Sequence, residues 1–100
     1  SNKENVKETA AQPDEAQTYL KQGYYVVRQG DNLAAICRKI YQTTAMMDKV
    51  CEANGIDDPE IKEIFELHYL EGKTQQKVAD EIGYTQARVS QIISGQLKDL

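Results

Sequence analysis

The chain has 100 residues, 16 of them acidic against 12 lysines and arginines, which gives a net charge of -4. This length suits one ordinary domain, or two very small ones that would each be marginally stable alone. No apolar run approaches the roughly 18 residues that a membrane-spanning helix needs, and the proportions of hydrophobic (40%) and charged (28%) residues are typical of a globular protein.

The first 22 residues are predicted to be a flexible lead or linker. Ser1 to Pro13 is polar and lacks apolar periodicity, so this segment has little surface to bury. Asp14 to Leu20 favours a short helix that ends before Gly23. Tyr24 to Arg28 is aromatic and β-branched, which predicts a strand.

Two amphipathic helices are predicted next. The apolar residues of the first recur with the spacing of one helical face, and they are Leu33, Ile36, Cys37 and Ile40. Asp31 or Asn32 is expected to cap this helix, and Thr44 is expected to cap the second. Asn54-Gly55 suits the end of the second helix, because both residue types tolerate a left-handed backbone.

The two cysteines, Cys37 and Cys51, lie on these predicted helices. They lack CxxC spacing, and this argues against a zinc site. We interpret them as two small buried hydrophobic residues. A disulfide between them is the alternative in an exported protein.

Four segments stand out between residues 24 and 59: the strand Tyr25-Val26-Val27, the turn from Gly30 to Leu33, the helix from Leu33 to Tyr41, and Asn54-Gly55-Ile56. Together they resemble the LysM family, small β-α-α-β modules that bind N-acetylglucosamine polymers such as peptidoglycan and chitin. The resemblance implies a groove in which backbone amides bond the acetamido groups of the sugar. The implied glycan-binding residues are Gly30, Asp31, Asn32, Leu33, Asn54, Gly55, Ile56 and Asp57.

The chain departs from this family where the second strand is expected. Directly after Pro59-Glu60, the segment from Ile61 to Leu67 has a helical pattern. A later segment, Ile93 to Leu97, would supply the strand if the residues between were an insertion. The interpretation that we favour is simpler, namely that Gly95-Gln96 just follows a helix end.

Three helices are predicted after residue 58, with Asp58, Thr74 and Thr85 as their caps. Counting Gln75 as the first position of a helix-turn-helix motif, suitable residues occupy the key positions Val78, Ala79, Ile82, Gly83, Val89 and Ile92. A small residue lets the two motif helices approach, and a glycine supplies the positive φ of the turn. The stretch from Ile61 to Ile93 resembles the helix-turn-helix of the fourth conserved region of bacterial sigma factors.

This second resemblance implies DNA binding by the last helix. A recognition helix reads base edges with its N-terminal half, where Arg pairs with guanine and Gln with adenine. The implied DNA-binding residues, with the first two near phosphates, are Lys73, Thr85, Gln86, Ala87, Arg88 and Gln91. From residue 60 on, however, seven acidic residues outnumber five lysines and arginines. A DNA-binding surface is usually basic, so a protein partner is the alternative for this motif.

The sequence therefore predicts an α+β protein with a small strand-helix-helix LysM-like unit at residues 23–58 and a three-helix helix-turn-helix unit at residues 59–100. The two are expected to be weakly coupled. No catalytic triad, paired carboxylates or phosphate loop is present, so no enzyme activity, cofactor or metal site is expected. The predicted function is a non-enzymatic bacterial protein that binds N-acetylglucosamine polymers and DNA.

Two alternatives remain open at this point. In one, the chain is a cytosolic, sigma-like transcription regulator whose LysM-like segment is only a scaffold or a protein-interaction surface. In the other, it is a chimera of two pieces. The localisation depends on the choice, because a glycan-binding module would face the cell wall and a DNA-binding one would be cytoplasmic.

Overall fold

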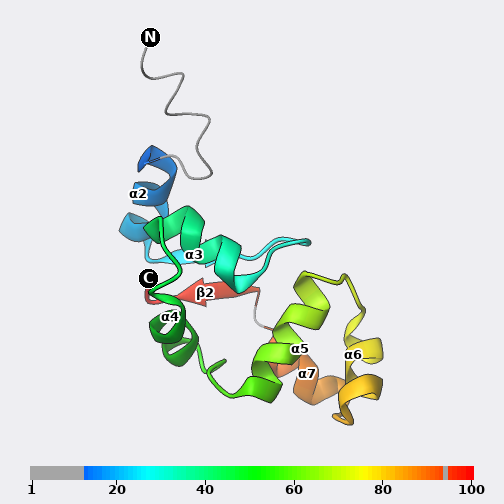
Figure 1. Ribbon diagram of the computed structural model, residues 1–100. Coiled ribbons are helices and arrows are strands. Elements are labelled where there is room, and N and C mark those ends of the chain that lie inside the picture. Colours follow the sequence, from blue (N-terminus) through cyan, green and yellow to red (C-terminus); the bar gives the residue numbers. More distant parts are fainter. Residues whose placement is uncertain (1–12, 94) are drawn as a thin grey trace.

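The computed structural model describes residues 13–93 and 95–100 (Figure 1). The elements in chain order are α2 (Pro13–Gln22), β1 (Tyr24–Val26), α3 (Leu33–Tyr41), α4 (Met47–Ala53), α5 (Pro59–Tyr69), α6 (Gln75–Ile82), α7 (Gln86–Ile92) and β2 (Gln96–Lys98). Figure 1 shows α2, α3 and α4 gathered around the strands, with α5, α6 and α7 beside them. The described residues are mostly helical with a two-stranded sheet, which is consistent with the predicted α+β class and its helix-turn-helix unit, whereas the LysM-like unit is not confirmed.

The two strands come from opposite ends of the chain and pair with each other. β1 and β2 are antiparallel, with Tyr25 opposite Leu97, and the Val27 amide extends the ladder by donating to the Gly95 carbonyl at 3.0 Å. Our favoured interpretation, that Gly95-Gln96 only follows a helix end, is therefore wrong. The backbone groups of a lone strand need partners, and β2 supplies them, so α5, α6 and α7 form an insertion between α4 and β2.

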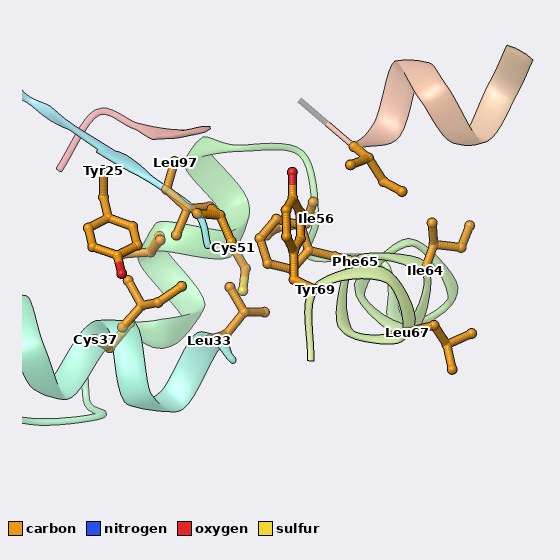
Figure 2. Close-up of a cluster of buried hydrophobic side chains, with 14 of the residues drawn as sticks. Tyr25, Leu33, Cys37, Cys51, Ile56, Ile64, Phe65, Leu67, Tyr69 and Leu97 are labelled. Carbon is orange, nitrogen blue, oxygen red and sulfur yellow. The ribbon is translucent and has the colours of Figure 1, made fainter. Parts of the chain in front are cut away.

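One cluster of buried side chains continues from the sheet into the inserted helices (Figure 2). Tyr25 and Leu97 contribute from the paired strands, and Phe65 contributes from α5. The other fully buried large side chains of this cluster are Leu33, Ile36, Cys37, Ile40, Ile64, Val78 and Val89. Both the strand pair and this core cross the predicted boundary between residues 58 and 59. The number of unfolding transitions stays a prediction.

The predicted caps of the helix-turn-helix are confirmed. Asp58 accepts from the amides at the start of α5, Thr74 accepts from the Lys77 amide at 3.1 Å, and Thr85 accepts from the Arg88 amide at 3.1 Å. These side chains satisfy amides that have no partner within the helix. They fix where each helix of the insertion begins.

The caps in the first half are confirmed only in part. Asn32 caps α3 by accepting from the Ala35 amide at 2.8 Å, whereas Asp31 accepts from the Tyr25 hydroxyl. Thr44 does not cap α4, because the helix begins at Met47 and Met46 occupies the cap position without a side-chain hydrogen bond. The carbonyl of Thr44 accepts from the Met47 amide instead.

Residues 13–22 form a packed helix, whereas the sequence predicted a short helix within a flexible lead. Ala16 of α2 is buried, and the Tyr19 ring meets the Tyr25 ring edge-on, with 5.0 Å between the centroids. The helix therefore covers part of β1 and α3. The rest of the predicted lead, residues 1–12, lies outside the described residues.

Candidate nucleic-acid interface and the predicted glycan groove

Helix α5 is hydrogen-bonded to the loop that was predicted to bind a sugar. The Gly30 amide donates to the Tyr69 carbonyl at 2.6 Å, and the Leu33 amide donates to the Glu66 carboxylate at 3.3 Å. The Gln29 side-chain amide also donates to the Tyr69 carbonyl, at 3.0 Å. Two of the backbone amides in the predicted glycan site, those of Gly30 and Leu33, are thus already bonded within the chain.

The apolar residues expected to flank the sugar, and Asn54 in the second loop, also have contacts within the chain. Leu33 and Ile56 are both buried, and Figure 2 shows Phe65 and Tyr69 of α5 next to Ile56. The side chain of Asn54 bonds β2, because it donates to the Lys98 carbonyl and accepts from the Lys98 amide. Gly55 and Asp57 remain exposed. The structure brings Leu33 and Ile56 of the two loops into one buried cluster, which also contains Phe65 and Tyr69 of α5.

The motif helices α6 and α7 pack as the helix-turn-helix pattern predicts. Val78 and Val89 are fully buried, and Ala79 is 1% exposed where α6 meets its neighbours. Gly83 has φ +87° at the end of α6, a conformation that glycine adopts without steric strain. The Tyr84 amide then donates back to the Ala79 carbonyl at 3.0 Å. This turn sets the position of α7 against α6.

Helix α7 presents the predicted base-reading residues to solvent. Gln86, Ala87, Arg88 and Gln91 are all exposed, whereas Val89 faces the core. The Arg88 guanidinium lies over the Tyr84 ring, 5.1 Å from its centroid, and such a contact restrains an arginine. The hydroxyl of Tyr84 in turn donates to the Glu60 carboxylate. This hydrogen bond is the main reason that the pKa of Tyr84 is raised.

The two cations of the motif that lie outside α7 differ in their partners. Lys73 Nζ is 2.9 Å from both carboxylate oxygens of Glu81 and 3.7 Å from Glu71. Lys77 is exposed in the first turn of α6, and no ion pair involves it within the described part of the chain. Lys77 is a candidate for a phosphate contact that was not among the DNA-binding residues predicted from the sequence. The signal was a lysine where a capping box has an acidic residue or glutamine.

The cysteines and the histidine lie in or beside the hydrophobic core. Cys37 and Cys51 are free and buried thiols, and burial raises the pKa of each. His68 lies at the boundary of the core, with Nδ1 2.8 Å from the Lys73 carbonyl. Across residues 13–93 and 95–100, no group of three metal-binding side chains gathers at one place. No helix in the same ranges has the length and apolarity to cross a membrane.

Comparison with known proteins separates the two halves of the chain. No curated protein and no solved structure matches the chain significantly, and nothing found supports the LysM resemblance of residues 24–59. The family sigma-70, region 4, matches residues 58–100, which comprise α5, α6, α7 and β2. Residues 58–100 are thus similar to a helix-turn-helix of the DNA-binding, transcription-related kind.

Proposed function

We propose that this chain is a non-enzymatic regulator of transcription that binds duplex DNA through α7. The observation that carries the proposal is the α6–α7 packing, in which Ala79 and Gly83 occupy the close-contact and turn positions of the motif. The match of residues 58–100 to sigma-70, region 4, supports the same function.

The exposed side chains of the motif suit two kinds of DNA contact. Arg88, Gln86 and Gln91 offer the donors and acceptors that read guanine and adenine in the major groove. Thr85 and Lys77 lie at the first turns of α7 and α6, where the polar and cationic groups of such motifs meet the phosphate backbone. In this proposal α7 reads the bases, and the first turns of α6 and α7 hold the motif on the DNA backbone.

The first half of the chain serves as a scaffold in this proposal. The Gly30 and Leu33 amides are hydrogen-bonded to α5, so this half supports the insertion and leaves these two amides no bond for a glycan. The acidic balance of the second half favours a protein partner as the alternative use of α7, since a DNA-binding surface is usually basic.

A selection experiment tests the proposal. Duplexes enriched from a random pool are bound to the full chain at low salt, and affinity is compared with that for random duplex by fluorescence anisotropy. Arg88→Ala is expected to lose roughly 1–3 kcal/mol of discrimination between enriched and random sequences. Arg38→Ala removes the same exposed side chain from α3 and should leave discrimination unchanged.

Two results would contradict DNA reading by α7. If no sequence binds better than random duplex at low salt, sequence recognition through α7 is excluded, and a protein partner is the remaining alternative for this helix. If Arg38→Ala and Arg88→Ala reduce discrimination equally, the recognition surface is not α7.

A further inference from the structure

Lys73 is held in an ion-pair network before any ligand arrives. It lies in the turn between α5 and α6, and its Nζ contacts both carboxylate oxygens of Glu81 at 2.9 Å, with Glu71 at 3.7 Å. Its backbone is also fixed, because the Lys73 amide donates to the Leu67 carbonyl at 3.2 Å. The cation that directly precedes the Thr74 cap of α6 therefore faces two carboxylates of its own chain.

We propose that Glu81 sets how tightly the helix-turn-helix binds the DNA backbone, by holding Lys73 in an internal ion pair. This inference rests on the proposed DNA binding. A phosphate that approaches Lys73 must either displace Glu81 or accept its negative charge nearby, and both lower the affinity. Because phosphate contacts act on all sequences alike, Glu81 keeps binding to random duplex weak.

The strength of the ion pair suits a moderating role. The side chains of Lys73 and Glu81 are 29% and 37% exposed, and exposed ion pairs are weak because water and salt screen them. A DNA phosphate can therefore compete for Lys73. Glu81 lowers the affinity by a few-fold without abolishing binding.

Two isosteric variants of the same helix test this role. Glu81→Gln removes the charge that faces Lys73, whereas Asp80→Asn removes an equal charge from a carboxylate that accepts from the Gln76 side chain at 2.9 Å. Binding of random duplex is measured for the full chain at several salt concentrations. Thermal unfolding of each variant checks that the fold is intact.

Glu81→Gln is expected to bind random duplex roughly two- to fivefold more tightly than Asp80→Asn does. Its plot of log affinity against log salt should be steeper by about 0.9, the contribution of one added phosphate contact. In a Lys73→Ala background, Glu81→Gln should lose this advantage over Asp80→Asn. That result would show that the gain in affinity comes from releasing Lys73 and not from the change in net charge.

Equal affinities and equal salt slopes for Glu81→Gln and Asp80→Asn would overturn the inference while leaving the proposed function intact. If neither the unaltered chain nor any variant binds any duplex at low salt, the proposed function itself fails, and the role of Glu81 fails with it. Equal, measurable binding by the two variants rejects only the role of Glu81, whereas the absence of any binding rejects the proposed function.

Discussion

The backbone amide of Leu33 donates a hydrogen bond to the carboxylate of Glu66, which lies 33 positions later in the chain. Leu33 is the first residue of α3, and Glu66 belongs to α5 of the insertion. A carboxylate near a helix N-terminus is stabilised by the partial positive charge there. The other carboxylate oxygen of Glu66 is buried and has no hydrogen-bond partner among the described residues. The Glu66 carboxylate thus links α5 of the insertion to the start of α3.

Removing this group should destabilise the fold. Glu66→Ala leaves the Leu33 amide without its acceptor and is expected to lower the free energy of unfolding by about 1–2 kcal/mol. Glu66→Gln keeps an acceptor and should lower it less. Urea denaturation measures both, with Glu63→Ala, an exposed site on the same helix, as the control. Equal losses for Glu66→Ala and Glu63→Ala would show that the contact contributes nothing.

The shared core predicts one unfolding transition, in place of the two weakly coupled units that the sequence suggested. Ile36 in α3 and Ile64 in α5 are matched probes, with 1% and 0% of their surface exposed. Truncating either to Ala should cost about 2–5 kcal/mol through lost burial and a cavity. Ala79→Leu should cost about 1–3 kcal/mol by overpacking the motif helices.

All three variants should shift one common transition, followed by amide signals from both halves. The competing result is selective melting: Ile36→Ala unfolds α3 and α4 while α6 and α7 remain folded. That result would restore the division at residue 58.

The helix-turn-helix was predictable because its signals are local. A cap such as Thr74, a turn glycine such as Gly83 and a small residue such as Ala79 each act within a few positions of the sequence. The strand pair was not predictable in the same way. Gln96-Leu97-Lys98 is too short to show a strand period, and its partner Tyr24–Val26 lies about 70 positions away by the pairing register.

The candidate site shows the same limit. Arg88 is exposed, as a residue that reads DNA must be, whereas its contact with a base stays a prediction. The ion pair between Lys73 and Glu81 depends on how the turn before α6 directs one side chain toward the last turn of that helix. The hydrogen bonds from the Gly30 and Leu33 amides to Tyr69 and Glu66 depend on where α5 packs. Neither contact leaves a pattern in the sequence.

The buried thiols predict a loss of stability in alkali. Burial raises the pKa of Cys37 and of Cys51 above the usual 9.0. A raised pKa in the folded state means that the thiols stabilise the fold fully below about pH 9. This contribution is lost as the pH rises through the folded-state pKa. The free energy of unfolding should therefore begin to fall above about pH 9 and continue to fall until the folded-state pKa is passed.

Urea denaturation across this range measures the effect, and Cys37→Ala should reduce the slope of stability against pH. Native protein should also react slowly with iodoacetamide near neutral pH. A flat stability profile, together with rapid alkylation of the folded chain, would contradict the burial of these thiols.

The two lysines at the start of the motif should differ in their contribution to DNA binding. Lys77 has no ion pair within the described residues, so Lys77→Ala should weaken binding to all sequences alike and reduce the salt slope by about 1. Lys73→Ala should have a smaller effect, because Glu81 already neutralises Lys73. Salt-dependent anisotropy measures both slopes. A larger change for Lys73→Ala would reverse the assignment.

The most direct test of the account is a map of amide chemical shifts in the labelled chain, first with an enriched duplex and then with chitin oligomers. We predict that the duplex shifts the amides of Gln86, Ala87, Arg88 and Gln91 most. We also expect millimolar chitin oligomers to leave the amides of Gly30 and Leu33 unchanged, because both are bonded to α5. Shifts at Gly30 and Leu33 with the sugar, and none in α7 with the duplex, would contradict it.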